Sequence, residues 1–315
     1  VLGPAEGGIS EERGVPLSAR NIDPSHLGIL DPSRTPESGH AGIDQRFTLT
    51  ATRDEEGRLY ARVVDKKGET IHIPVTKMMS SVIGFADQKN NGSDTVEAQD
   101  HGEMRRVPRS KVEYWISDPT SLYTVTTNLV PFLNSNHPGR LTMAGKALPQ
   151  ALSLVNREIP LVQTLNHLGT PFVKAIGRIS STAAGKAGEV IEANEKRVVI
   201  KTAEGEKHII QPVKNLPFNM KGFHDDEDPI VKVGDKVKAN DSVYNNNYTV
   251  NGHLSLGKNL TAAYLPYKGY NHEDGIVISN SAADTLTSHH AYKVDYEVNA
   301  DTVAKKSLLR RYFPG

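Results

Sequence analysis

Glycine and proline interrupt this chain along its whole length and limit it to short elements. Among 315 residues there are 26 glycines and 18 prolines, while hydrophobic residues reach only 37%. Proline lacks a backbone donor and glycine adopts turn conformations, so this mixture is typical of short strands and many turns. The sequence therefore predicts a mostly β structure with some α (α+β).

Length and charge restrict the classes of function. Domains usually run to about 100–200 residues, so we expect two or three compact regions. Lys plus Arg and Asp plus Glu both total 37, and any nucleic-acid binding must therefore come from a local patch. Cysteine is absent, which excludes disulfides, zinc-thiolate sites and thiol catalysis. Because no apolar run approaches about 20 residues, we expect a cytoplasmic protein.

Turn residues separate several runs of strand-like sequence. Residues 1–46 show neither helical nor strand periodicity, which indicates either disorder or a functional loop layer. We expect a β-meander over 47–52, 59–64 and 70–73. A hairpin is expected over 188–191 and 197–202, with 208–210 as its third strand.

Other segments are less regular. Residues 122–133 fit either a buried strand or a short helix, and 144–155 fit a helix interrupted at Pro149. A glycine turn is expected in 231–238, at a barrel corner. The asparagine-rich stretch 244–248 is expected to be a mobile loop.

The run from His224 to Asp228 is the most obvious candidate metal cluster. Five consecutive polar residues point in several directions, so we favour a solvated loop. Lys186 resembles part of a phosphate-binding loop, but Ala187 stands where a magnesium-binding hydroxyl would be required. His289 and His290 have no partner at ligand spacing and are interpreted as a surface pair.

Arg140 and the adjacent acids Glu273 and Asp274 are the stronger candidates. Arg140 follows a turn at 136–139 and could grip a triphosphate through its planar fork, although a surface salt bridge is the alternative. Neighbouring residues of an extended chain face opposite sides. The two acids can therefore share one cavity only if the backbone turns between them.

Four segments, in order, resemble the β subunit of multisubunit, cellular-type RNA polymerases. They cover residues 2–14, 20–37, 111–151 and 259–279. The second is similar to the family pattern Arg-Asp-x-His-Pro-Thr-His-x-Gly followed by Thr-Pro-Glu-Gly. The fourth is similar, almost residue for residue, to Ala-Phe-Met-Pro-Trp-x-Gly-Tyr-Asn-Phe-Glu-Asp. This chain departs from the family at positions that include Glu11, Gly139, Lys146 and Pro149.

The resemblance implies a role for each matched residue. Arg140 corresponds to the arginine that touches the triphosphate of the incoming nucleotide, and Glu273 and Asp274 are expected near the second magnesium, through water. The resemblance also implies nucleic-acid contacts by Arg13, Glu37, Lys146 and Gln150. The cofactor is Mg²⁺, whose principal ligands are expected on a β′-type partner.

The resemblance also implies an architecture of three regions. Residues 1–46 would form a fork-loop and active-centre loop region, and 47–120 a β-meander region. Residues 121–315 would form the first part of the β-subunit barrel, half of a double-psi β-barrel, with a hybrid-binding insertion. The resemblance further implies one piece of a split subunit, or a fragment of a longer one, and a bacteriophage source.

A polymerase function implies several partners. These are a β′-type subunit, the remaining β portions, α-like or sigma-like factors, template DNA, nascent RNA and nucleoside triphosphates, with no membrane. The setting would be a bacterial or infected-host cytoplasm. The alternative is a non-catalytic β-barrel module that binds nucleic acid or a polymerase. A carbohydrate or phosphate enzyme using Glu273 and Asp274 is the least favoured option, because no nucleophile accompanies them.

Overall fold

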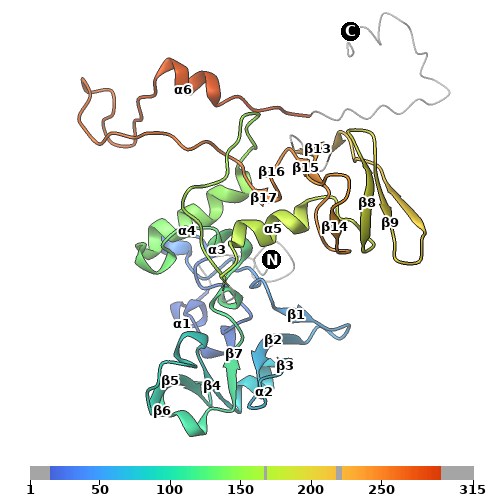
Figure 1. The fold of residues 1–315 in the computed structure, drawn as a ribbon. Helices are drawn as coiled ribbons and strands as arrows, with labels where there is room; N and C mark the ends of the chain where they lie inside the picture. The colour runs from blue at the N-terminus through green and yellow to red at the C-terminus, as the bar shows by residue number, and fades with distance from the viewer. Residues whose placement is uncertain (1–14, 167–168, 218–221, 292–315) are drawn as a thin grey trace, which may run out of the picture.

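The computed structural model describes residues 15–166, 169–217 and 222–291. Short strands predominate over short helices (Figure 1), so the predicted mostly β fold with some α is confirmed. Within the described residues, none of the helices has the length and apolar character needed to cross a membrane.

A seven-stranded sheet organises the first half of the chain. Its strands are β1 (Thr52–Arg53), β2 (Leu59–Val64), β3 (Thr70–Pro74), β4 (Val82–Gly84), β5 (Thr95–Asp100), β6 (Glu103–Pro108) and β7 (Tyr114–Ile116). Their order is β1-β2-β7-β4-β5-β6, with β3 also paired to β2. Pairing is antiparallel throughout except between β4 and β7, which run parallel.

The meander prediction is correct for its second and third strands and wrong for its first. β2 and β3 form the expected pair. Residues 47–51 instead follow the preceding loop: Phe47 makes an isolated bridge to Leu30, and the buried Thr48 hydroxyl donates to the Gly28 carbonyl at 2.8 Å. These contacts turn the backbone away from the sheet, so pairing begins only at Thr52.

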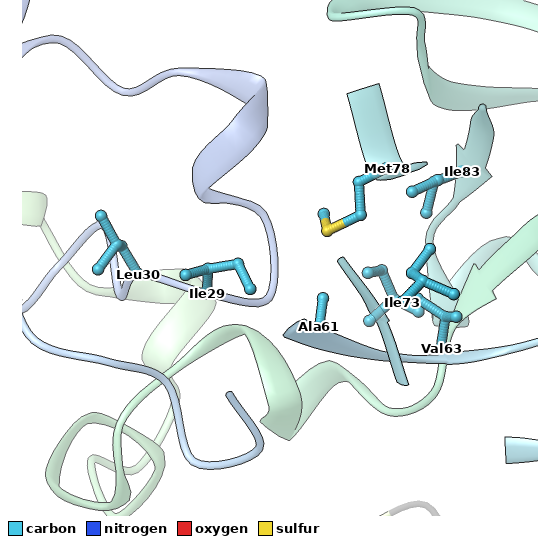
Figure 2. Close-up of a cluster of buried hydrophobic side chains, with 8 residues drawn as sticks. Ile29, Leu30, Ala61, Val63, Ile73, Met78 and Ile83 are labelled. Atoms are coloured by element: carbon cyan, nitrogen blue, oxygen red, sulfur yellow. The ribbon is translucent and has the colours of Figure 1, made fainter. Parts of the chain in front are cut away.

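The loop region ahead of the sheet shares its hydrophobic core. It contains only α1 (Leu17–Arg20), η3 (Pro24–His26) and η4 (Ser38–His40) in its described part. Ile29 and Leu30 nevertheless belong to the buried cluster of the sheet, beside Ala61 and Met78 (Figure 2). Burying such side chains contributes roughly 1.5–3 kcal/mol each, which fixes the loop against the sheet.

Short helices surround and follow the sheet. Around it lie α2 (Val75–Met79), η5 (Ala86–Gln88) and η6 (Arg109–Lys111). After it come η7 (Pro119–Leu122), α3 (Val125–Asn128), η8 (Leu133–Ser135), α4 (Pro138–Ala147), η9 (Leu148–Gln150) and α5 (Phe172–Ser180). The ambiguous stretch 122–133 is therefore helical where it is regular. The helix expected over 144–155 begins earlier, at Pro138, and changes to a 3₁₀ turn that contains Pro149.

A second sheet forms from β10 (Lys207–Ile210), β9 (Val198–Lys201), β8 (Gly188–Ala193) and β14 (Lys236–Val237), in that order. This arrangement confirms the expected hairpin and its third strand. The predicted glycine turn is also present, because Gly234 has φ +94° and precedes β14. The sheet has a hydrophobic core of its own, which includes Val190, Ile200 and Tyr244.

Three small antiparallel pairs complete the strands. They join β11 (Leu216–Pro217) with β12 (Phe223–His224), β13 (Asp226–Pro229) with β15 (Tyr244–Asn246), and β16 (Thr249–Val250) with β17 (His253–Leu254). The mobile loop predicted at 244–248 is wrong. Tyr244 and Asn246 are fully buried, because β15 pairs with β13 and packs into the core.

The solvated loop predicted for His224 to Asp228 is also wrong. These residues belong largely to β12 and β13, and Asp226 is 0% exposed. Its carboxylate accepts from the Thr182 hydroxyl at 2.6 Å and the Val213 backbone at 2.9 Å, and it lies 3.0 Å from His224 Nε2. A buried carboxylate is tolerated when its oxygens are satisfied in this way.

Candidate functional site

Arg140 lies in the first turn of α4. The helix starts after His137, whose Nδ1 accepts from the Gly139 backbone at 3.2 Å, and Pro138 occupies the first helical position, where a missing donor has no cost. The opposite side of the helix buries Leu141 and Gly145. Arg140 is left exposed, and its guanidinium lies 3.8 Å from Met143 Sδ.

Arg140 has no carboxylate partner among the residues that the structure describes. Surface arginines can pair with nearby carboxylates, and such exposed ion pairs contribute little net stability. No such pair engages Arg140 in the described part of the chain. Its fork of donors therefore remains available for an external anion such as a phosphate.

The structure brings together two other predicted residues, Glu37 and Lys146. The Lys146 ammonium group, on α4, donates to the carboxylate of Glu37 in the loop region. This hydrogen bond, with the lysine charge, holds the pKa of the Glu37 carboxyl below its ordinary value. The pair joins the loop to the helix that carries Arg140.

A buried aspartate ties the loop region to the start of α3. Asp31 is 1% exposed, and its carboxylate accepts from the Ser33 backbone at 2.8 Å and from the Thr124 backbone at 2.6 Å, just before α3. Nearby, burial and the charge of Arg46 lower the pKa of the Arg34 guanidinium. The described part of the loop region thus carries Arg34 and Arg46 on a backbone that Asp31 and Glu37 tie to the helical region.

Gln150 ends η9 and is exposed. It lies on the same continuous helical stretch as Arg140 and Lys146, from Pro138 to Gln150. Arg13, the remaining predicted nucleic-acid contact, lies outside the described residues.

The acidic pair lies in a different environment, an extended segment at 259–279. Glu273 adopts a left-handed backbone, φ +54°, and the Gly275 backbone donates to the His272 carbonyl at 3.0 Å. The chain therefore does turn at the acids, which was the condition for their acting together. Both side chains are exposed, and Glu273 has a single long contact to His272 at 3.7 Å.

The apolar residues 276–278, which follow the acidic pair, form no strand within the described chain. Ile276, Val277 and Ile278 carry no strand assignment and are all exposed. A strand requires a partner for its backbone groups, and no described segment pairs with this one. In Figure 1 the segment from 259 to α6 (Asn280–Thr285) extends away from the sheets.

Arg140 and the acidic turn are not joined in this structure. Among the described residues, no hydrogen bond or ion pair connects Arg140 with Glu273 or Asp274. Nor does any group of three or more His, Cys, Asp or Glu in that part of the chain form a metal site. Two exposed carboxylates suit a magnesium ion that keeps most of its waters, but do not form a protein cage.

Sequence reasoning missed two buried residues, Arg157 and Asn128, whose side chains fix the backbone around them. Arg157, whose side chain is 6% exposed, pairs with Glu227 and donates to the carbonyls of Asn246 and Thr249 beside a cavity of 710 Å³. Asn128 on α3 donates to three carbonyl groups. An isolated arginine or asparagine carries no pattern in the sequence that marks it as buried.

Comparison with known proteins gives this arrangement its context. A family described as RNA polymerase Rpb2, domain 6, matches residues 164–311. DNA-directed RNA polymerase subunit beta of Syntrophomonas wolfei subsp. wolfei is 30% identical over 325 residues, covering 98% of this chain and 28% of that subunit. The same subunit of Ehrlichia canis (strain Jake) is 30% identical over 327 residues, covering 98% and 23% respectively.

The β-rich fold and the domain match define a chain of the multisubunit RNA polymerase class. The chain belongs to the β-subunit family of DNA-directed RNA polymerases and corresponds to one portion of such a subunit. It spans about a quarter of the length of the two relatives. The predicted family is thereby confirmed, and a half of a double-psi β-barrel is consistent with the matched domain.

Proposed function

We propose that this chain forms the nucleotide- and hybrid-binding wall of the active centre in a DNA-dependent RNA polymerase. The observation that supports this most strongly is the similarity to two polymerase β subunits along 98% of the chain. A resemblance confined to one motif would leave function open, whereas this one includes every candidate site residue.

In this proposal Arg140 binds the triphosphate of the incoming nucleotide. Its exposed guanidinium has no described carboxylate competitor, and α4 fixes its backbone. A planar fork can contact two phosphate oxygens at once, and such contacts stabilise the charge that develops as pyrophosphate departs. The role requires a second surface opposite α4, supplied by a β′-type subunit.

Glu273 and Asp274 would hold the nucleotide-borne magnesium ion through water molecules. Magnesium supplies neutralisation of the departing pyrophosphate, and its principal ligands would lie on the β′-type partner. The turned, exposed backbone at Glu273 leaves both carboxylates accessible to such an ion. Their approach to Arg140 would follow when the extended segment packs against a partner.

Arg13, Glu37, Lys146 and Gln150 would contact the nucleic-acid backbone without reading sequence. The ion pair between Glu37 and Lys146 suggests a division of labour. Glu37 orients the ammonium group while leaving its remaining donors for a phosphate.

The remaining features of the proposal concern context. We propose magnesium as the cofactor, with further β portions, α-like or sigma-like factors, template DNA and nascent RNA as partners. We also propose the division into regions 1–46, 47–120 and 121–315, a bacteriophage source, and a bacterial or infected-host cytoplasm. The diverged motifs and the cysteine-free composition support the last two assignments.

The test is an Arg140→Ala substitution in the assembled enzyme. We expect the apparent nucleotide KM to rise, or turnover to fall, by at least about tenfold, equivalent to about 1.4 kcal/mol. Arg105→Ala is the matched control, because Arg105 is an exposed arginine on β6 outside the proposed site, and it should leave both parameters unchanged.

An unchanged nucleotide dependence in the Arg140 variant would contradict the assignment. The subunits and the activity of the purified assembly also distinguish the proposed polymerase from a non-catalytic module. A polymerase should co-purify with a subunit that carries an aspartate triad and should synthesise RNA from a template. A binding module should do neither.

A further inference from the structure

A second cavity is lined by neither Arg140 nor the acidic turn, and the proposed function gives it no role. It measures 890 Å³, within the range of small-molecule sites. Its wall comes from three separated parts of the chain, residues 86–90, 116–135 and 162–166. Such a cavity forms only when the sheet region and the later segment pack together.

One wall residue is a buried amide with an unused acceptor. Asn128 is 4% exposed, and its Nδ2 donates to the carbonyls of Thr120 at 2.8 Å, Tyr123 at 3.3 Å and Thr124 at 3.0 Å. Carbonyl oxygens can only accept, so the NH₂ group must face them and the orientation of the amide is fixed. Its Oδ1 receives no donor from the described residues and is not fully enclosed, which leaves it open to a ligand.

Two further hydroxyl groups on this wall lack partners among the described residues. The Ser117 Oγ is buried without a hydrogen bond. Tyr123 makes no hydrogen bond through its phenol, and burial, followed by the charge of Asp31, raises the pKa of that group. The Tyr123 hydroxyl and the Asn128 acceptor are therefore available to a ligand, whereas the Ser117 hydroxyl is enclosed.

The rest of the lining mixes polar side chains, among them Asp87, Lys89 and Asp118, with apolar groups that are exposed at the entrance. Phe132 adopts a left-handed backbone at φ +53° and is 73% exposed, while Val162 and Leu165 are 50% and 58% exposed. A non-glycine residue in this conformation is strained, and such strain is concentrated at binding sites. Exposed aromatic and aliphatic groups around a cavity provide a surface for a flat ring.

We propose that this cavity binds a small, neutral, planar ligand whose ring N–H donates to Asn128 Oδ1. The proposal is independent of the polymerase role, because it requires neither Arg140 nor the acidic pair. A neutral ring with one donor suits the exposed apolar groups together with the acceptor whose orientation is fixed at Asn128.

The test uses indole as the probe, measured by saturation-transfer NMR on the purified protein with any subunits that accompany it. We expect indole to bind with a Kd on the order of 1 mM, as a fragment of this size allows. Benzofuran has the same shape with oxygen in place of the N–H. It should bind about tenfold more weakly, because the acceptor then stays unpaired.

Two neighbouring substitutions locate the site. Val162→Glu places a carboxylate at the entrance and should weaken indole binding at least about fivefold, a measurable change in Kd. Leu161→Glu is the matched control, because Leu161 is 83% exposed and does not line the cavity. Both side chains are exposed, and circular dichroism checks that each variant remains folded.

Four results would overturn the proposal. One is the absence of indole binding, and another is an equal effect of the two substitutions on it. The third is benzofuran binding as tightly as indole, which would show that the Asn128 acceptor is not used. Tighter binding of N-acetyltryptophanamide than of indole would identify a polypeptide side chain as the occupant and would likewise reject a small molecule.

Discussion

Glu37 and Lys146 show how a single contact can connect two distant parts of the chain. They are 109 residues apart in sequence, yet their side chains form an ion pair between the loop region and α4. Both are partly exposed, so the contact contributes more to geometry than to stability. Its value lies in holding the loop next to the helix that carries Arg140.

The pair predicts a specific titration behaviour. The folded protein should show a Glu37 carboxyl pKa below the ordinary 4.5, because Lys146 donates to it. The contact is then fully present above that ordinary pKa and is lost as pH falls through the lowered folded value. Carboxyl-detected NMR titration measures the shift directly.

Lys146→Met is the comparison that tests the cause, since it keeps the length of the side chain and removes the charge. The pKa of Glu37 should return toward 4.5 in this variant. A pKa that stays low would mean that another group holds the carboxylate.

At the scale of elements, α5 depends on a close backbone approach. Gly177 lies in the middle of α5, and a Cβ there would meet the Gly252 carbonyl oxygen at 2.2 Å, beside β17. Backbone cannot move aside as a flexible side chain can. The helix therefore rests directly on the β16–β17 hairpin, and this contact requires glycine.

Gly177→Ala should destabilise the protein even though alanine favours a helix by about 1 kcal/mol over glycine. We expect a loss of roughly 1–3 kcal/mol in the free energy of unfolding, measured by urea denaturation, because overpacking forces the backbone apart. Gly145→Ala in α4 is the control, with a nearest neighbour at 3.5 Å, an ordinary contact, and should be neutral or stabilising. Equal effects of the two substitutions would disprove the close-approach argument.

Elements with local signals could be predicted, and those that depend on distant partners could not. β2, β3 and the β8–β9 hairpin follow from strand composition between turns. The parallel β4–β7 pair joins Ile83 to Tyr114, and no local pattern specifies it. The first meander strand failed because Phe47 pairs with Leu30 instead, a tertiary contact that overrides propensity.

The site residues fall into the same two groups, those with a local sequence signal and those whose surroundings depend on distant partners. Motif resemblance indicated Arg140, Glu37 and Lys146, but could not indicate that the last two pair with each other. Burial of Asp226 was missed because its three partners, Thr182, Val213 and His224, lie at different distances along the chain. A run of acids looks solvated in sequence until such partners are known.

At the scale of the whole molecule, the segment 259–279 is distinguished by what it leaves uncovered. Tyr264 is 101% exposed, and Leu265, Tyr270 and Ile276 are also exposed. Contiguous exposed apolar groups of this kind mark interaction surfaces. They support the proposal that this segment packs against another part of a polymerase.

Limited digestion with chymotrypsin tests that view. In the purified chain alone, cleavage at the described tyrosines should occur first after Tyr264 or Tyr270, whereas Tyr244, which is fully buried, should resist. In an assembly with a β′-type subunit, cleavage in the segment should slow by at least about tenfold, because a covered site must open before it is cut. Mass spectrometry of the first fragments identifies the sites. Equal rates alone and in the assembly would argue against burial of this segment by a partner.

The core that the loop region shares with the sheet predicts where loss-of-function substitutions should occur. Ile29 packs into the same cluster as Val63 and Met78, so the position of the loop that carries Glu37 depends in part on the core of the sheet. A screen for variants that have lost the proposed activity should therefore yield substitutions at Val63 or Met78 as readily as at charged positions. Such alleles would imitate catalytic defects, and cooler growth would restore them where it would not restore a missing guanidinium.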